Sequence, residues 1–274
     1  MIHSSKIMPA MLEKLVDQDF GKISGQIERS ISGYVSKSSA KGLVVGLSGG
    51  LDSSVVLKLA ANALLPSRVL GIVMPSDTTP KEDVDHAVKL AASFGVRYHV
   101  IDINPLLEKY AEVLPEDKKA RGNLMARIRM NILYYYANIN GYIVAGTSDK
   151  SELQIGYFTK FGDGAADILP IAGLYKTQVR ALARHLGIPN EIVEKKSSPR
   201  LWLDHLAEQE IGMDYEVMDP ILYLLVDRKM KPKAAAKRLG LPVSQVNRVK
   251  GMIETSLHKR SMPVAVSSIN NSSF

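Results

Sequence analysis

The stretch Val44–Ser54, VVGLSGGLDSS, leaves an apolar, β-branched run through small residues and then places a carboxylate, Asp52, near the start of a helix. Glycines carry no Cβ, so a Ser-Gly-Gly turn between a strand and a helix lets backbone N–H groups approach an anion closely. The positive end of the helix dipole favours the same charge. The stretch therefore predicts a cradle for phosphate at the end of an apolar strand.

The first half of the chain alternates short apolar runs with helix-length segments. The predicted strands are Leu43–Leu47, Val69–Met74, Tyr98–Ile101 and Tyr142–Ala145. The predicted helices are residues 19–38, Ser53–Leu64, Lys81–Phe94 and Gly122–Asn138. This alternation predicts a doubly wound, Rossmann-like α/β fold: a parallel sheet with helices on both faces, which binds ligands outside the carboxyl ends of its strands.

The second half is less regular. After Gly146 the periodicity is lost until a predicted helix at Thr177–Leu186, and two more helical segments are predicted at residues 220–229 and 232–257. We therefore expect a single domain, residues 1–274, with a C-terminal helical segment at 220–260.

Composition excludes several classes of protein. With 274 residues, 46% of them hydrophobic, the chain is long enough to bury a full core. It contains no cysteine, which excludes a disulfide framework, a thiolate zinc site and a cysteine nucleophile, and favours a cytoplasmic protein. Residues 1–20 have acids within their apolar stretch, and no window reaches the roughly 18 apolar residues of a membrane span. We expect neither secretion nor membrane insertion.

The net charge of +7 is concentrated in one region. Residues 228–260 hold ten Lys or Arg and one acid, which leaves about −2 for the rest of the chain. Such a region binds an anionic partner or is a solvated helix face. Within it, residues 231–253, KPKAAAKRLGLPVSQVNRVKGMI, have the pattern of a helix-turn-helix, so a nucleotide-regulated DNA-binding protein is a rival hypothesis.

The acid in the glycine turn indicates a metal. The P-loop pattern G-x-x-x-x-G-K-[ST] is absent because no lysine follows the glycines. A carboxylate beside bound phosphates is repulsive unless a cation lies between them, so Asp52 is a candidate ligand of Mg²⁺. The alternative is an aspartate in a glycine-rich turn that only caps the helix.

The segment SGGLDSS resembles the pyrophosphate-binding loop of the N-type ATP pyrophosphatases, which share an adenine nucleotide alpha hydrolase-like fold. These enzymes cleave ATP between its α and β phosphates and adenylate a substrate oxygen. The resemblance implies an ATP site over the loop residues Gly46, Leu47, Ser48, Gly49, Gly50, Leu51, Asp52 and Ser53. The loop alone leaves the acceptor open between deamido-NAD, xanthylate, a tRNA base and others.

Four further segments resemble NAD synthetases. They are GNLMARIRM (Gly122–Met130), AGTSDKSE (Ala145–Glu152), GYFTKFGDGAADILPIAGLYKTQVRALARHLGIP (Gly156–Pro189) and HKRSMPV (His258–Val264). The resemblance implies ATP-dependent amidation of deamido-NAD to NAD, with Mg²⁺, and commonly a homodimer with no nucleic-acid partner. Glutamine-dependent relatives carry an additional domain with a cysteine nucleophile, so this chain is expected to use ammonia.

The resemblance also assigns residues around ATP. Asp52 and Glu152 are expected to hold one metal ion, and Thr147 and Lys176 to lie near the nucleotide. A cation at a helix start needs an anion, which ATP phosphate supplies; a surface lysine is the alternative. For Glu152 the alternative is a capping box formed by Ser148 and nearby acids. We expect these residues with Asp52 to form the catalytic set.

The chain departs from many relatives in EKKSSPRLW, where Ser198 stands at the position of a threonine near the triphosphate. This stretch and PSDTTPKED (Pro75–Asp83) have the composition of lids, or equally of inert loops.

The deamido-NAD contacts are expected in three places. Arg127 and Arg129 lie on different sides of one predicted helix, and the motif favours Arg127 as the one that faces the cleft. An exposed helical arginine is the alternative. Lys160 and Asp167 lie in a glycine-rich segment with aromatic neighbours suited to stacking on a ring. A loop that plugs the core explains the same segment. His258 and Lys259 complete the set.

Overall fold

The structure is a computed structural model that describes residues 4–263. Val264, the last residue of the HKRSMPV segment, lies outside the described residues. A parallel sheet of four strands forms the centre, in the order β3-β2-β1-β4. Its strands are β1 (Leu43–Leu47), β2 (Val69–Val73), β3 (Arg97–Val100) and β4 (Ile143–Ala145). The predicted strands are confirmed, with shifts of one residue at their ends.

The central strands β1 and β2 are buried on both faces because they are apolar throughout. Val45 packs into one hydrophobic cluster and its neighbour Val44 into another, and both side chains are 0% exposed. Successive side chains of a strand point to opposite faces, so a strand covered on both sides needs a continuous apolar run. The predicted doubly wound α/β fold is confirmed.

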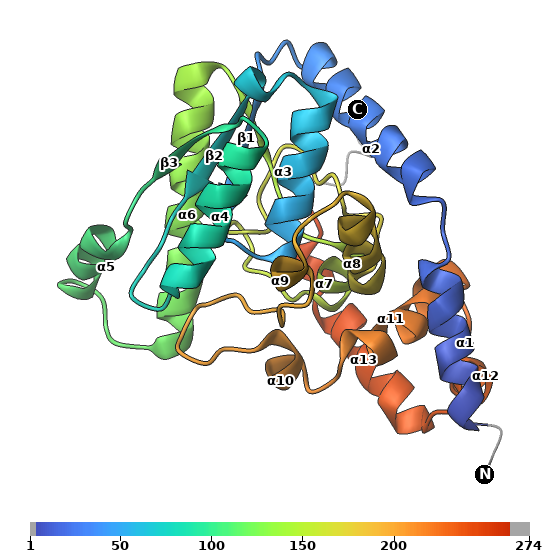
Figure 1. Ribbon diagram of the computed structural model, residues 1–274. Helices are drawn as coiled ribbons and strands as arrows, with labels where there is room; N and C mark the ends of the chain where they lie inside the picture. Colours follow the sequence, from blue (N-terminus) through green and yellow to red (C-terminus); the bar gives the residue numbers. More distant parts are fainter. Residues whose placement is uncertain (1–3, 264–274) are drawn as a thin grey trace, which may run out of the picture.

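Two layers of helices cover the sheet (Figure 1). The cluster on one face draws on α2 (Phe20–Lys37), α3 (Leu51–Ala63), α4 (Lys81–Ser93), α8 (Lys176–His185) and α9 (Asn190–Val193). The other face is covered by α5 (Asn104–Ala111) and α6 (Lys118–Asn140). From β1 the chain builds the sheet outward in one direction through β2 and β3, and it later adds β4 on the opposite side of β1. In such sheets ligands bind at this switch point, beyond the carboxyl ends of the strands.

A second hydrophobic core lies among helices beside the sheet layers. It combines α1 (Ser4–Val16), α7 (Lys150–Ile155), α10 (Ala207–Ile211), α11 (Tyr215–Leu222), α12 (Pro232–Leu239) and α13 (Val243–Thr255). Figure 1 shows α1 packed beside α12, so the start of the chain completes the helical part. Three short segments, η1 (Pro66–Arg68), η2 (Tyr223–Asp227) and η3 (Leu257–Lys259), complete the described secondary structure.

The C-terminal helices differ from expectation in two places. The predicted helix at 220–229 begins earlier, at Tyr215, and continues after Leu222 as the π-helical turn η2. The predicted helix at 232–257 is divided at Gly240, whose φ of +67° ends α12 in the left-handed conformation. Glycine adopts this conformation without a steric penalty, and Pro242 then caps the next helix. Among residues 4–263, no helix combines the length and the apolar character that a membrane crossing requires.

Candidate active site

A cavity of about 510 Å³ opens at the carboxyl ends of β1, β2 and β4, where the sheet order places the ligand site. Each of these strands contributes residues at or just beyond its end to the wall: Gly46, Leu47, Ser48, Met74, Pro75, Gly146 and Thr147. The start of α3 adds Gly50, Leu51, Asp52 and Ser53. The glycine turn identified from the sequence is therefore part of the cavity.

The two glycines of the turn have different roles. Gly49 has a φ of +71°, and a Cβ on it would lie 2.0 Å from the carbonyl oxygen of Asp83 in α4. This glycine is needed because the turn packs against α4, and it does not line the cavity. Gly50 caps α3 in an extended conformation and does line the cavity. The expectation that both glycines open space for phosphate is thus corrected for Gly49.

Lys176 is the centre of a buried ionic cluster. Its side chain is 0% exposed, and Nζ lies 2.8 Å from Asp52 Oδ2, 2.9 Å from Asp149 Oδ2 and 2.8 Å from Glu152 Oε1. Burial alone lowers the pKa of a lysine, but the three carboxylates outweigh it and raise the Lys176 pKa well above its ordinary value. The expected anion is present, but in this structure carboxylates supply it.

Burial dominates the titration of two of these acids. It raises the pKa of Asp149, and it raises that of Glu152 well above its ordinary value, although Lys176 opposes both shifts. Asp149 also accepts a hydrogen bond from the Glu152 N–H at 2.8 Å and thereby caps α7. The capping residue is therefore Asp149, one position after the Ser148 considered from the sequence.

A buried aspartate from the helical part joins α7 to α8. Asp219 accepts a hydrogen bond from Ser151 Oγ at 2.6 Å and another from the Thr177 N–H at 2.9 Å. Ser151 Oγ in turn accepts the Lys176 N–H at 2.9 Å. Burial raises the pKa of Asp219 to about 7. These bonds hold the helix starts that carry Glu152 and Lys176 side by side.

The acidic cluster fits a magnesium ion only as part of a larger ligand set. Asp52 Oδ1 is buried and has no hydrogen-bond partner within the described residues, so one carboxylate oxygen is available. Asp52 and Glu152 both line the cavity. Residues 4–263 contain no group of three His, Cys, Asp or Glu arranged to hold a metal. Mg²⁺ is commonly bound by one or two carboxylates together with substrate phosphates and water, and this pair suits that mode.

The arginine that faces the cavity is Arg129 and not Arg127. Arg129 lines the wall, donates from Nε to the Met74 carbonyl at 3.1 Å, and has its pKa lowered to about 10 by burial. Arg127 is exposed and donates to the Lys160 carbonyl at 3.3 Å. Two positions along a helix differ by about 200°, so only one of these side chains points to the end of β2. The expectation for Arg127 is wrong in this respect.

The HKR segment docks onto the aromatic loop that follows α7. Lys259 Nζ donates to the carbonyl oxygens of Gly156 at 2.7 Å and Phe158 at 2.8 Å, and Lys259 lines the cavity. Lys160 Nζ donates to the His258 carbonyl at 2.8 Å. Lys160 and His258 do not line the cavity. The structure therefore brings the two sequence segments together and directs one lysine to the wall.

Asp167 and Ser198 both use their polar atoms within the protein. Asp167 Oδ2 accepts the Val144 N–H of β4 at 2.7 Å, and the residue lies outside the cavity wall. Ser198 lines the wall, donates from Oγ to the His205 carbonyl, and accepts the Arg200 N–H at 3.2 Å. Thr147 also lines the wall.

Comparison with known proteins decides the family. A family model described as NAD synthase matches residues 23–263. The chain belongs to the NAD synthase family. A relative in Hyperthermus butylicus, named NH(3)-dependent NAD(+) synthetase, is 54% identical over 94% of this chain and 95% of its own length. A protein of the same name in Aeropyrum pernix is 46% identical over 93% of this chain and 91% of its own length.

Two solved structures of similar proteins share the fold of this NAD synthase family member. An NMN synthetase from Francisella tularensis has a TM-score of 0.81 at 32% identity and covers 91% of this chain and 99% of its own. An NH3-dependent NAD synthetase from Campylobacter jejuni, in complex with nitrate ion, has a TM-score of 0.79 at 30% identity. It covers 91% of this chain and 100% of its own.

Family membership also explains the helix-turn-helix pattern. Residues 231–253 do form two helices around a turn, α12 and α13. However, Arg248 donates to the carbonyl oxygens of Ile211 and Gly212, and two valines of α13, Val246 and Val249, are buried in the helical core. The Arg248 guanidinium is therefore bonded to the end of α10. The pattern is that of two packed helices of an NAD synthase.

Several cavity residues were not found from the sequence. They are Asp83, Asn123, Lys195, Arg200, Trp202, His205 and Glu210. Asp83 resembles an ordinary acid in the first turn of a helix, and nothing local shows that its side chain is only 5% exposed. The two segments that carry Asp83, Lys195 and Arg200 were recognised only as possible lids.

Proposed function

We propose that this chain catalyses the ATP-dependent amidation of deamido-NAD to NAD with ammonia, and that the cavity beyond β1 and β4 is the active site. The observation that supports the proposal most strongly is the shared wall of the cavity, where the glycine turn, Asp52, Thr147 and Glu152 meet. Both relatives described above are named NH(3)-dependent NAD(+) synthetase, and they match this chain over nearly their whole length.

The first step is adenylation. An oxygen of the nicotinate carboxylate attacks the α-phosphorus of ATP, the bond between that phosphorus and the bridging oxygen to the β-phosphate breaks, and pyrophosphate leaves. A carboxylate must approach a triphosphate, so the reaction needs positive charge around the phosphates. The backbone N–H groups of the glycine turn and the start of α3 supply it from the protein. Lys176 does not line the cavity, and its ammonium is paired with Asp52, Asp149 and Glu152, so we assign it the role of holding these carboxylates in place.

Asp52 and Glu152 are proposed to hold Mg²⁺, which supplies Lewis-acid stabilisation of the phosphate oxygens when bound. In the second step the nitrogen of ammonia attacks the activated carboxyl carbon, the bond to the AMP oxygen breaks, and a proton is released. Products are the amide and AMP. The protein needs no covalent nucleophile, and it must exclude water from the acyl adenylate until ammonia arrives.

For deamido-NAD, the resemblance supports Arg127, Lys160, Asp167, His258 and Lys259 as binding residues. Of these, Lys259 lines the cavity, whereas the other four lie around the aromatic loop or the end of β4. Ser198 is proposed near the triphosphate. We also propose that the protein acts in the cytoplasm without a nucleic-acid partner.

The deciding experiment is an incubation of the purified chain with ATP, Mg²⁺, ammonium and one acceptor at a time. We expect AMP, pyrophosphate and NAD in equal amounts with deamido-NAD. Xanthylate, tRNA and the mononucleotide counterpart of deamido-NAD serve as comparison acceptors. Product formation with one of these alone would overturn the proposal, and turnover with glutamine but without ammonium would contradict the proposed nitrogen source.

We further propose a homodimer that buries an apolar surface of α6. Tyr135 and Ile139, one helical turn apart on α6, are 65% and 63% exposed. Large apolar side chains grouped in this way are typical of protein interfaces. We expect the double substitution Tyr135→Asp and Ile139→Asp to weaken dimerisation by about 100-fold or more. Sedimentation equilibrium measures this.

The matched control is Val113→Asp, which places the same charge on a residue that is 76% exposed on another part of the surface. It is expected to leave the dimer intact. A protein that is monomeric before substitution, or a dimer insensitive to both aspartates, would refute this interface.

A further inference from the structure

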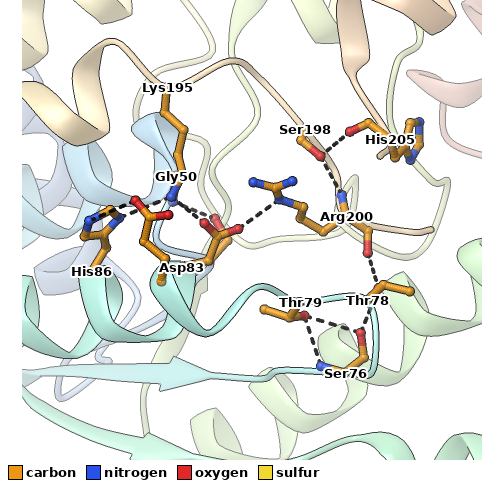
Figure 2. A network of polar contacts seen from close by, with 12 residues as sticks. Gly50, Ser76, Thr78, Thr79, Asp83, His86, Lys195, Ser198, Arg200 and His205 are labelled. Carbon is orange, nitrogen blue, oxygen red and sulfur yellow. Dashed lines mark hydrogen bonds and ion pairs between the residues drawn. The ribbon is translucent and has the colours of Figure 1, made fainter. Parts of the chain in front are cut away.

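A buried carboxylate at the cavity holds two cations of one segment. We call residues 195–201 the cationic strap, because three of its first six residues, Lys195, Lys196 and Arg200, are basic. Asp83 Oδ1 accepts a hydrogen bond from Lys195 Nζ, and Asp83 Oδ2 accepts one from Arg200 Nε at 2.9 Å. Figure 2 shows the two basic side chains converging on this carboxylate.

Asp83 also fixes the distance between the strap and the glycine turn. Its backbone carbonyl packs so closely against Gly49 that a Cβ there would lie 2.0 Å away. Its side chain holds Lys195 and Arg200 of the strap, which are 112 and 117 residues further along the chain. A single residue of α4 therefore links the proposed phosphate cradle with Lys195 and Arg200.

The strap carries more positive charge than Asp83 neutralises. Two full cations meet one carboxylate, and all three residues line the cavity together with the glycine turn. Lys195 Nζ also lies 3.2 Å from His86 Nδ1. The two terminal guanidinium nitrogens of Arg200 have no hydrogen-bond partner within residues 4–263 (Figure 2). An anion in the cavity can therefore bind Arg200 without breaking its bond to Asp83.

The cavity is electrically asymmetric. At one side three carboxylates surround Lys176, and at the other two cations surround Asp83. A triphosphate with a divalent ion is complementary to this arrangement, because the ion suits the acidic side and the terminal phosphates suit the basic side.

The backbone of Arg200 is held in a conformation that this residue rarely adopts. Its φ is +52°, in the left-handed region, which is disfavoured for a residue with a Cβ. Thr78 Oγ1 donates to the Arg200 carbonyl at 2.6 Å, and Ser198 Oγ accepts the Arg200 N–H at 3.2 Å. Figure 2 shows these two contacts above and below the Arg200 backbone. If shape alone mattered here, asparagine or glycine would suit the position better than arginine.

We propose that Asp83 is a positioning residue of the ATP site: it holds Lys195 and Arg200 beside the glycine turn, where these two cations bind the β and γ phosphates and the departing pyrophosphate. This inference rests on the proposed function for the identity of the anion. It assigns Asp83 no contact with ATP, so its effect passes through the strap.

The test uses inorganic pyrophosphate with Mg²⁺ as the probe and calorimetry as the readout, without deamido-NAD. Arg200→Asn is expected to bind pyrophosphate about tenfold more weakly, since it loses charge-assisted hydrogen bonds. Its melting temperature is expected to change little, because asparagine tolerates a positive φ. Asp83→Asn should also weaken binding by about tenfold, and Asp83→Glu should restore part of the loss.

Asp85→Asn is the matched control, an exposed acid on the same helix with no contact to the strap. It is expected to bind pyrophosphate as the original protein does. A positioning role also predicts non-additivity: Asp83→Asn added to Lys195→Gln and Arg200→Asn should cause no further loss beyond about twofold. In turnover, the KM for ATP should rise in Asp83→Asn while the KM for deamido-NAD stays constant.

Two results would overturn the inference: pyrophosphate affinity within twofold of the original in Arg200→Asn and Lys195→Gln, or equal losses for both substrates in Asp83→Asn. If Asp83→Asn does not fold, the strap variants still decide the matter. The binding assay needs no turnover, so the two proposals can fail separately. If the original protein makes no NAD but the strap variants bind pyrophosphate more weakly, the proposed function is refuted and this inference stands.

Discussion

Replacing Lys176 by methionine is expected to lower the free energy of unfolding by about 3–5 kcal/mol, because the fully buried Asp149 and the partly exposed Asp52 and Glu152 then lose their shared cation. For a chain of this size the loss corresponds to a fall of roughly 10 °C in melting temperature. Urea unfolding and calorimetry measure both quantities. Amidation activity should disappear as well, since Asp52 and Glu152, the proposed magnesium ligands, lose the cation that holds them in place.

The loss of stability in Lys176→Met should be larger at high pH than at low pH. Burial already raises the pKa of Asp149 and Glu152 in the folded protein, and removal of the ammonium should raise both further. The folded state then binds more protons than the unfolded state, so its stability falls as pH rises through the raised pKa values. We therefore expect a smaller difference from the original protein at pH 5 than at pH 8.

Lys250→Met is the control for this variant. Lys250 pairs with Glu254 at 2.9 Å on the surface of α13, with both side chains well exposed. Such pairs contribute at most about 1 kcal/mol. Equal destabilisation by the two substitutions, or a Lys176→Met deficit that does not change with pH, would contradict the buried ionic cluster.

Asp52→Asn is expected to lose activity but to retain its fold, whereas Lys176→Met loses both activity and stability. Asn cannot supply the anionic ligand proposed for Mg²⁺, so the rate should fall by about 1,000-fold or more, equivalent to about 4 kcal/mol. Asp149 and Glu152 still neutralise Lys176, and one like charge is removed from the cluster. The free energy of unfolding should therefore change by less than about 1 kcal/mol.

Steady-state kinetics with deamido-NAD, ATP and ammonium measures the Asp52→Asn effect, and thermal unfolding tests the fold of the same sample. Asp85→Asn again serves as an exposed control of equal charge change. If Asp52→Asn retained a tenth or more of the activity, Asp52 would be removed from the proposed metal site.

Local pattern predicted most of the sheet layers. The strand at Leu43–Leu47 was placed without error, and α3 and α4 were placed to within two residues, because period and boundary residues depend on neighbours along the chain. The helices α1, α5, α7, α9 and α10 were not predicted. Four of these are eight residues or shorter, and too few apolar positions fall within such a span to establish a period.

Motifs predicted part of the site. Gly50 of the glycine turn, Thr147, Ser198 and Lys259 line the cavity together with Asp52 and Glu152, whereas Gly49 and Lys176 do not. Arg127 was preferred to Arg129 because a motif states which residues recur but not the direction in which each side chain points. That direction depends on how α6 rotates when it packs on the sheet.

The sequence by itself determined the parallel sheet, the strand–turn–helix with its acid and the kinship with NAD synthases, since each depends on residues close together in the chain. Only the tertiary structure decided the ionic partners. Lys176 meets Asp52 across 124 positions, and Lys195 meets Asp83 across 112. The physical reason is that the free energy of a buried charge depends on every group around it, and the order of the strands brings those groups together.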